Sequence, residues 1–388
     1  MNKTCVRSKE NMNSIGVMPM LGNILKHVNL LRSNYLSNRT KIMSTVNNQL
    51  QKLIDKEIGK RYTHNVLLGV QSGDGKIDFK GAAGEASPES PYFVASIAKI
   101  FTATVIMQLF DEGKLHLEDY IEKYLSHLPL DGIHKYKGID YSKQLKVYQL
   151  LNQTSGLSDY FEGGLAEDFK KNQDRSYSLE DVLEMARNSN AFSPPDSGKS
   201  YYSDTNFQLL GEIIETITGQ SLNDVFKARI FNPLGMTETY LFDHNNASKP
   251  MKPIPPYYKD TQLSLPLAIT SERGTGGAVS TMSDLLMFLR SFFEGNLFKK
   301  NHLKSMMKWN SMFFPMQYGY GIWRYKLPRW ANMFRETPEF IGHAGVWGAM
   351  AFYNPKNDIY IVGTLNQLHK PARQFSFMPR VLNIVTGV

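Results

Sequence analysis

Cysteine is nearly absent from this chain of 388 residues, in which Cys5 is the single example. One cysteine cannot form an internal disulfide framework or a cysteine-rich metal site. The nine histidines include no HExxH pattern, which is the signature of a zinc hydrolase. The glycine-containing stretch SGDGK (72–76) is not a phosphate-binding loop. We therefore expect neither a metal ion nor an organic cofactor.

Long apolar runs are missing as well. No stretch approaches the roughly 18 apolar residues that a membrane-spanning helix needs. Residues 1–43 are basic and rich in Asn and Ser, with Glu10 as their one acidic residue, and their short apolar patch is broken by Pro19. No convincing cleavage site follows that patch, so the segment is a poor secretory signal. We interpret it as a disordered appendage of a cytoplasmic protein. A weak transit peptide, or a start codon placed too early ahead of Met43, are the alternatives.

A concentrated basic surface is also lacking, although the net charge is +8. Lysine and arginine are scattered and mixed with Asp and Glu, and nothing resembles a zinc finger or an RNA-binding aromatic motif. We therefore expect no nucleic-acid partner. A composition of 42% hydrophobic and 21% charged residues is typical of a soluble globular protein.

The chain does contain strands near both ends and helices in the middle. Sequence patterns predict a hairpin at 64–83 with an Asp74-Gly75 turn, and strands at 318–325, 338–343, 347–354 and 358–365. They predict helices at 44–58, from Ser96 to about Gly113, and at 178–189, 205–219, 221–231, 280–293 and 374–386. We expect an α+β fold, with an antiparallel sheet flanked by helices (44–115 plus 271–388) and an inserted, mostly helical domain (116–270).

The stretch YFVASIAKIF (92–101) places a serine and a lysine in the first turn of a buried helix. Ser96 lies in the positive field of the helix N-terminus, and Lys99, three residues later, shares its face. Burial is unfavourable for an ammonium group unless it is paired or neutralised, and a neutral lysine can accept the proton of a serine hydroxyl. A capping serine beside a snorkelling lysine is the structural alternative. A second S-x-x-K, from Ser305 to Lys308, lies in a basic, Met-rich segment, and its context does not indicate a catalytic role.

Two further stretches add to this pattern. PPDSGKSYYSDTNFQLLG (194–211) places Tyr202-Ser203-Asp204 just before a buried helix. EFIGHAGVWGAMAFY (339–353) places His343-Ala344-Gly345 between two strands, with glycines that permit close backbone approach.

In this order and at these distances, the three elements resemble the serine β-lactamase and penicillin-binding protein superfamily. The nearest branch is that of class C β-lactamases, D-Ala-D-Ala carboxypeptidases, D-aminopeptidases and related carboxylesterases. The resemblance extends over about 48–386 and is supported by LLNQTSGLSDY (150–160), FNPLGMTET (231–239) and GTGGAVSTMSDLLMF (274–288). It implies a β-lactamase/transpeptidase-like fold.

The resemblance also implies catalytic roles. Ser96 would be the acylated nucleophile and Lys99 its proton acceptor, and Tyr202 matches the tyrosine that relays a proton to the leaving group. The backbone N–H groups of Ser96 and Val346 would form the oxyanion hole, the paired donors that stabilise the oxyanion of acyl transfer.

Substrate binding is implied for a further set of residues: Asp204, His343, Ala344, Gly345, Gln153, Tyr318 and Trp347. Asp204 stands where the family usually has Asn, and its charge would stabilise a protonated Lys99 or attract an amine-bearing substrate. Ala344 offers no hydroxyl where the family often has Lys-Thr-Gly, which weakens the case for a substrate carboxylate. A protonated His343 could still bind one.

Our first hypothesis is a serine hydrolase that works through an acyl-enzyme, as an esterase or amidase of a small ester, amide or peptide substrate. Within the same family, a β-lactamase, a D-Ala-D-Ala carboxypeptidase or a D-aminopeptidase is the alternative. A non-catalytic binding protein on this fold should have lost Ser96, Lys99 or Tyr202, and all three are present. An α/β-hydrolase would need G-x-S-x-G, which does not occur.

Overall fold

The computed structural model describes residues 43–245, 251–332 and 337–387. Contacts divide the chain into two units, Met1–Gln49 and Leu50–Val388. In the first unit only residues 43–49 are described, and they are helical, as are residues 50–58 of the second. The interpretation of residues 1–43 as an appendage therefore lies outside the described residues, apart from Met43. All that follows concerns the second unit.

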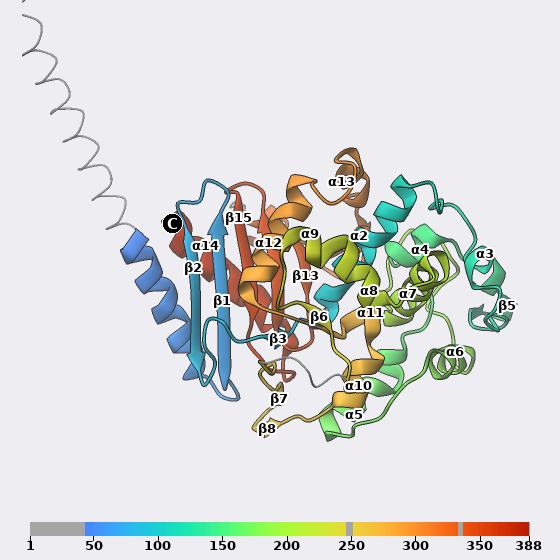
Figure 1. Ribbon diagram of the computed structural model, residues 1–388, viewed down its shortest axis with the longest axis horizontal. Helices are drawn as coiled ribbons and strands as arrows, with labels where there is room; N and C mark the ends of the chain where they lie inside the picture. The colour runs from blue at the N-terminus through green and yellow to red at the C-terminus, as the bar shows by residue number, and fades with distance from the viewer. Residues whose placement is uncertain (1–42, 246–250, 333–336, 388) are drawn as a thin grey trace, which may run out of the picture. The chain divides into compact units, whose positions relative to one another are not determined.

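Eight antiparallel strands form the main sheet, in the order β10-β11-β12-β13-β14-β15-β1-β2 (Figure 1). Two strands come from the first part of the chain and six from the last: β1 (Asn65–Ser72), β2 (Asp78–Gly84), β10 (Asn310–Ser311), β11 (Met316–Tyr318), β12 (Trp323–Lys326), β13 (Glu339–Ala344), β14 (Ala349–Asn354) and β15 (Ile359–Thr364). Because β1 pairs with β15, distant parts of the chain build one sheet. The predicted α+β fold with an antiparallel sheet is confirmed.

The β1–β2 hairpin has the predicted turn. Gly75 adopts φ +66°, a backbone conformation that residues other than glycine rarely adopt. The amide of Gly75 donates to the carbonyl of Ser72 at 3.0 Å, and the Ser72 hydroxyl donates to Asp74 Oδ1 at 2.7 Å. The local Asp-Gly signal is therefore sufficient to place this turn.

The single strand predicted over 318–325 is wrong. The structure has two antiparallel strands there, β11 and β12, in which Tyr318 pairs with Trp323. The chain reverses at Gly319 and Gly321, where Gly321 adopts φ +71°. A Cβ at Gly319 would lie 2.1 Å from the Met306 carbonyl oxygen. The two glycines therefore make a turn where the apolar pattern alone predicts one continuous strand.

Helices α12 (Met282–Glu294) and α14 (Gln374–Thr386) cover opposite faces of the sheet. Successive side chains of a strand point to opposite faces. In β14, Tyr353 stacks on Phe293 of α12 with ring centroids 4.8 Å apart, whereas its neighbour Phe352 contacts Phe375 of α14 at 6.0 Å. The Thr281 side chain caps α12 by accepting from the Asp284 amide, as its sequence pattern predicts.

The middle of the chain is mostly helical. Its helices are α2 (Ala98–Asp111), α3 (Glu122–Leu125), α4 (Val147–Leu151), α5 (Ala166–Lys171), α6 (Leu179–Arg187), α7 (Asp204–Thr218), α8 (Leu222–Phe226), α9 (Asn232–Leu234), α10 (Pro266–Ser271) and α11 (Arg273–Gly276), with α13 (Asn301–Met306) later in the chain. Two π-helical segments, Phe161–Leu165 and Lys227–Phe231, precede α5 and follow α8. The helix predicted at 221–231 is therefore interrupted at Lys227.

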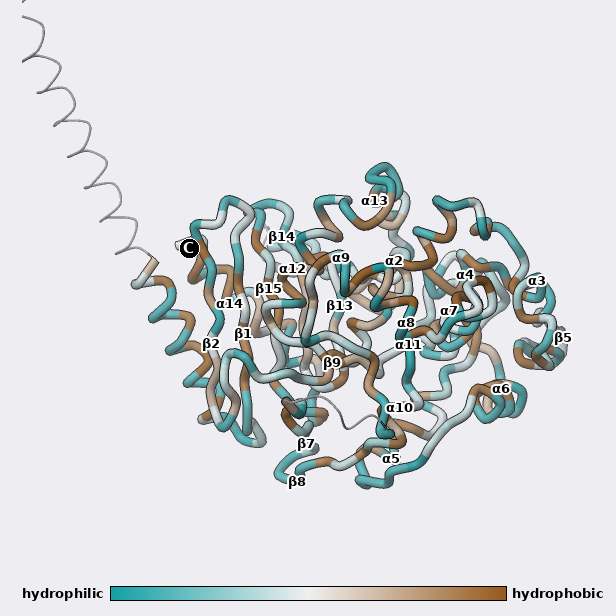
Figure 2. Tube along the Cα trace, viewed as in Figure 1, coloured by the Kyte–Doolittle hydropathy of each residue, from teal (hydrophilic) through white to brown (hydrophobic). Residues whose placement is uncertain are grey.

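Three short strands form a second sheet, in the order β3 (Tyr92–Phe93), β9 (Ala278–Ser280) and β6 (Tyr240–Leu241). Its strand β3 shortly precedes the start of α2. The remaining strands form two small hairpins: β4 (Lys135–Tyr136) with β5 (Ile139–Asp140), and β7 (Tyr257–Tyr258) with β8 (Thr261–Gln262). Figure 2 shows the apolar character of β1 and of α2, which belong to the main hydrophobic core. The division into a sheet domain and a helical domain (116–270) stays a prediction.

Candidate active site

Ser96 lies in a tight 3-10 turn, η1 (Ala95–Ile97), that leads into α2. Ala95 adopts φ +50°, in the left-handed region, which costs a non-glycine residue roughly 1–2 kcal/mol. The end of β13 packs directly against this turn, where a Cβ at Gly345 would lie 2.7 Å from the Ala95 Cβ. Glycine at 345 therefore permits the close approach that the sequence predicts, and it holds the serine turn against the sheet.

Lys99 is fully buried and has three hydrogen-bond acceptors. Its Nζ lies 3.1 Å from Ser96 Oγ, 2.8 Å from the Thr275 carbonyl oxygen and 2.6 Å from Asp204 Oδ1. An ammonium group has three N–H donors, so each donor finds one acceptor. Of the two ways to bury a lysine, the structure uses pairing, and Asp204 is the partner.

Three helices bring these groups together. Lys99 is on α2, Asp204 is the first residue of α7, and the Thr275 carbonyl belongs to α11. The α2 and α11 backbones can approach closely because residue 274 is a glycine. A Cβ there would lie 2.7 Å from Thr102 Oγ1. The Thr102 hydroxyl donates to the Gly274 carbonyl at 2.8 Å and fixes this contact.

Tyr202 lies beside the serine and the lysine. Lys99 Nζ is 5.2 Å from the centre of its ring. Burial, followed by the negative charge of Asp204, raises the pKa of Tyr202 well above 10.0, although the Ser96 hydroxyl acts in the opposite direction. The phenol is therefore neutral around pH 7 and is able to donate a proton.

The amides of Ser96 and Val346 are both free to bind an oxyanion. Ser96 is in the first turn of its helix, where N–H groups have no acceptor within the helix. Val346 follows β13 in the loop that leads to β14. Within the described ranges, neither amide is a donor in the hydrogen bonds of loops and turns.

Two buried carboxyl groups that the sequence reasoning missed, Asp159 and Glu272, lie near the Lys99–Asp204 pair. Asp159 Oδ1 accepts from the amides of Asp204 and Phe161 at 2.9 and 3.1 Å. Burial, reinforced by the charge of Asp204, raises the pKa of Asp159 to about 8 and that of Glu272 to about 8. Their sequence signals are slight, since Asp159 is the next-to-last residue of one motif stretch and Glu272 lies two residues before another. At pH 7 both are mainly protonated, so Lys99 faces one carboxylate.

Asp159→Asn should stabilise the protein increasingly between pH 4 and pH 8. The folded protein holds the Asp159 proton up to about pH 8, whereas the unfolded chain loses it near the usual pKa of 3.8. The wild type therefore loses stability across this window, and asparagine, which can still accept from both amides, does not titrate. Melting temperatures at pH 4, 6 and 8 give the measurement. A difference that stays constant over this range would contradict the raised pKa.

A cavity of about 530 Å³ opens over Ser96. Ser96, Tyr202, Ala344, Gly345 and Val346 line it together with three carboxyl side chains, from Asp159, Glu162 and Asp204. The rest of the wall is mainly apolar and includes residues that sequence reasoning missed: Phe161, Phe313, Pro315, Met316, Trp323, Tyr325, Ala372, Gln374 and Phe375. Most of these come from β11, β12 and α14. No local sequence motif predicts that these three elements meet.

Four predicted substrate-binding residues do not line this cavity: Gln153, Tyr318, His343 and Trp347. Each is at most 3% exposed, and their direct contact with a substrate stays a prediction. In this structure they are core residues, and their contacts are with other parts of the chain.

His343 is a neutral, fully hydrogen-bonded imidazole. Its Nδ1–H donates to the Ala344 carbonyl at 2.7 Å, and its Nε2 accepts from the Tyr318 hydroxyl at 3.3 Å. Burial, followed by the positive charge of Lys99, lowers the pKa of His343 well below 6.5. A protonated His343 is therefore not available to bind a carboxylate.

Gln153 and Trp347 also have packing partners. Gln153 Oε1 accepts from the Ser203 amide at 3.0 Å and from the side chain of Asn206. Gln153 thus fixes the turn that carries Tyr202 into α7. Trp347 stacks on Phe169 with ring centroids 5.1 Å apart.

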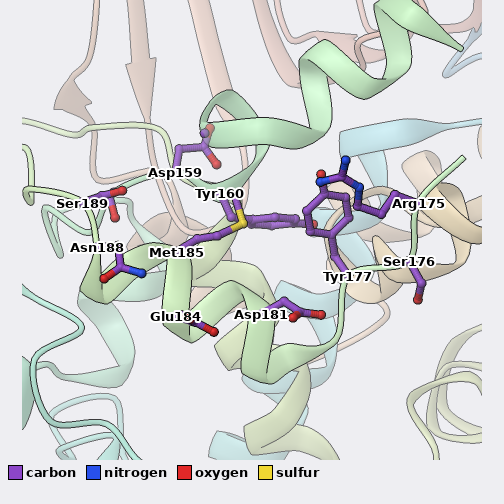
Figure 3. A pocket seen from close by; sticks show the side chains of 12 residues that line it. Asp159, Tyr160, Arg175, Ser176, Tyr177, Asp181, Glu184, Met185, Asn188 and Ser189 are labelled. Atoms are coloured by element: carbon purple, nitrogen blue, oxygen red, sulfur yellow. The ribbon is translucent and has the colours of Figure 1, made fainter. Parts of the chain in front are cut away.

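A second cavity, of about 460 Å³, shares Asp159 with the first in its lining. Figure 3 shows Tyr160, Met185 and Tyr177 between Asn188 on one side and Arg175 on the other. Its lining contains no lysine beside a serine, within the part of the chain that the structure describes. It therefore lacks a serine–lysine pair like that of Ser96 and Lys99.

In the described ranges, no three His, Cys, Asp or Glu side chains are grouped so that they could hold a metal ion. None of the described helices is long and apolar enough to cross a membrane.

Comparison with known proteins gives consistent matches. Residues 51–378 match the family model described as Beta-lactamase. Protein flp from Staphylococcus aureus (strain N315) is 29% identical over 219 residues, which cover 54% of this chain and 41% of that protein. A putative D-alanyl-D-alanine carboxypeptidase from Escherichia coli O157:H7 is 24% identical over 375 residues, which cover 84% of this chain and 83% of that protein. The match to Protein flp thus spans about two fifths of that relative.

Among solved structures, a D-stereospecific amidohydrolase from Streptomyces sp. has a TM-score of 0.68 and 25% sequence identity. The match covers 84% of this chain and 94% of that chain. The chain therefore has a known fold, the β-lactamase/transpeptidase-like fold.

Proposed function

Because this chain belongs to the beta-lactamase family, we propose that it is a serine hydrolase that forms an acyl-enzyme on Ser96 and cleaves small esters or amides. One observation carries the proposal. The Ser96 hydroxyl, in the wall of an apolar cavity, lies 3.1 Å from a buried lysine amine that is itself held by Asp204. The amidohydrolase and the putative carboxypeptidase that the chain resembles are hydrolases by name.

The Lys99–Asp204 pair supplies the base. In this proposal Lys99 transfers a proton to Asp204, 2.6 Å away, which leaves the Lys99 amine with an electron pair for the Ser96 hydroxyl. It accepts the hydroxyl proton as Ser96 Oγ attacks the substrate carbonyl carbon. The asparagine that the family usually has at this position could not hold that proton. Asp204 can, so it gives this site a place to store a proton.

The remaining steps use Tyr202 and the two free amides. The Ser96 and Val346 amides stabilise the tetrahedral oxyanion. The neutral Tyr202 phenol protonates the leaving group as the bond from the carbonyl carbon breaks, and it regains a proton from Lys99. Water then attacks the acyl-enzyme with the same groups in reversed roles, which releases the acid and restores Ser96.

The cavity lining favours neutral or cationic substrates over carboxylates. No lysine, arginine or histidine is among the described residues that line it, while Asp159, Glu162 and Asp204 are. Ala344 offers no hydroxyl to a substrate carboxylate, and His343 is neutral and buried. An ester or an amine-bearing amide therefore fits better than a β-lactam or a peptide C-terminus.

We expect the kcat/KM for p-nitrophenyl butyrate to exceed that for nitrocefin, because nitrocefin carries a carboxylate. Losing one charge-assisted hydrogen bond to a carboxylate costs about 1.5–3 kcal/mol, which is roughly a 10- to 150-fold difference. The preference should grow between pH 6 and pH 8.5 as Asp159, with a pKa of about 8, becomes negatively charged.

Ala344→Thr should shift this ratio towards nitrocefin, since it adds the missing hydroxyl. Both substrates are to be measured with background hydrolysis subtracted at each pH. A wild-type kcat/KM for nitrocefin above that for the butyrate ester at both pH values would overturn the esterase proposal in favour of β-lactam hydrolysis.

A further inference from the structure

The three most exposed large apolar side chains among the described residues lie close together. They are Trp330, Phe314 and Phe313, which are 66%, 64% and 55% exposed. Trp330 stacks on Phe314 with ring centroids 5.6 Å apart and an angle of 23° between the rings. Single exposed apolar residues are normal on a protein surface, whereas a contiguous group of them marks a surface that binds a partner or a membrane. We call these three residues the aromatic patch.

The register of the main sheet assembles the aromatic patch. Two of its residues lie in the turn between β10 and β11, and the third lies in η5 (Arg329–Asn332), which follows β12. Because Met316 at the start of β11 pairs with Tyr325 near the end of β12, the turn and η5 meet at the same end of the sheet. The patch is therefore held by backbone pairing rather than by a single flexible loop.

A cavity of about 480 Å³ adjoins the aromatic patch, and Phe313 and Phe314 belong to its lining. The charged residues that line it are all cations: Arg324, Lys326 and Arg329. No Asp or Glu is among the described residues of this lining, and we call it the basic cavity. Glu339 lies beside it and accepts from Arg324 at 2.7 Å and from Lys326 at 3.1 Å. Three cations and one anion leave a net charge of +2, and Arg329 is exposed.

An anionic phospholipid bilayer complements both of these features. A tryptophan ring suits the headgroup region of a bilayer, and protein segments that lie on bilayers combine Trp, Phe or Leu with Lys and Arg. The cations of the basic cavity would attract anionic headgroups at short range. The net charge of +8 on the whole chain acts in the same direction at longer range. An uncharged surface would leave the cations unused, and a cationic one would be repelled.

We propose that the aromatic patch and the basic cavity dock this protein on an anionic phospholipid bilayer, with Trp330 and Phe314 entering the headgroup region. Docking involves no turnover, so it does not depend on the proposed hydrolase function. Phe313 lines both the basic cavity and the cavity over Ser96. A bilayer on the aromatic patch therefore lies beside the cavity over Ser96.

Sedimentation of the full-length protein with lipid vesicles tests the docking surface. The mixed vesicles contain phosphatidylcholine and phosphatidylglycerol in equal parts, and the neutral vesicles contain phosphatidylcholine alone. We expect the wild type to bind the mixed vesicles more tightly. Trp330→Ser should weaken this binding about 10-fold, the scale for removing one large apolar side chain from an apolar contact. Arg329→Gln should weaken binding to the mixed vesicles about 5-fold and leave binding to the neutral vesicles unchanged.

Two control variants make the same chemical changes outside the basic cavity. Tyr120→Ser removes an aromatic side chain that is 52% exposed, and Arg61→Gln removes an exposed cation. Both controls should bind vesicles as the wild type does. The melting temperatures of all four variants should stay near that of the wild type, because each altered side chain is exposed. Residues 1–43 are also basic, so the comparison between variants, rather than wild-type binding alone, decides the outcome.

Three results would overturn the proposal. The first is a Trp330→Ser variant that binds mixed vesicles as tightly as the wild type, or no more weakly than the two controls. The second is a wild type that binds neutral and mixed vesicles equally well. The third is a wild type that binds neither kind of vesicle but is a dimer in analytical ultracentrifugation, with Trp330→Ser monomeric. In that case the aromatic patch joins two copies of this chain and does not contact lipid.

Discussion

Ser96→Ala should abolish covalent labelling by a fluorophosphonate and lower kcat for a p-nitrophenyl ester on the order of 10⁶-fold, the scale of loss seen when the nucleophile of a serine hydrolase is removed. The reason is geometric, because Ser96 Oγ is the hydroxyl next to the Lys99 amine in the cavity wall. Peptide mass mapping of the labelled wild type should place the tag within residues 92–99.

Ser305→Ala is the matched control for this experiment. Ser305 also stands three residues before a lysine, but that lysine, Lys308, is exposed, and Ser305 does not line the cavity. The control variant should keep full labelling and full turnover. A tag on Ser305, or an unlabelled wild type that still hydrolyses the ester, would remove Ser96 from the nucleophile's role.

Lys99→Met should lower kcat/KM about 10²- to 10⁴-fold, the usual contribution of a general base. It should also destabilise the protein by about 3–5 kcal/mol, because it leaves the Asp204 carboxylate buried without its cation. Ester hydrolysis gives the first effect, and urea unfolding gives the second.

The double variant Lys99→Met/Asp204→Asn separates the chemistry from the folding. It has no unpaired buried charge, so most of the lost stability should return, whereas activity should stay low because no base is present. If activity returns together with stability, the lysine is a structural residue and the proposed mechanism is wrong. Turnover near the wild-type level in the single variant would lead to the same conclusion.

Several features of this protein follow from its sequence alone because the interactions that cause them are local. The Asp74-Gly75 turn needs one residue with positive φ, and Gly75 provides it. Ser96 and Lys99 lie together because a helical turn brings residues three apart onto one face. The α+β fold with its antiparallel sheet is predictable since strand patterns occur at both ends of the chain.

The choice between a cavity wall and the core is not local. His343 and Ala344 are neighbours in β13, and adjacent strand residues point to opposite faces of a sheet. Ala344 therefore reaches the cavity, while His343 is buried behind it. A motif identifies the strand and its residues, but the packing of the other elements decides which face holds the substrate.

Tertiary structure alone decided what surrounds Ser96. The Thr275 carbonyl reaches Lys99 across 176 residues of sequence. Asp159 and Glu272 become protonated carboxylic acids because packing removes them from water and places them near the charge of Asp204. The aromatic wall with Trp323 and Gln374 forms where β12 meets α14. Sequence spacing determined the pairing of Ser96 with Lys99, since the helix itself sets that geometry. Burial determined the protonation of Asp159 and Glu272 and the shape of the cavity, because solvent exclusion depends on every element that packs around them.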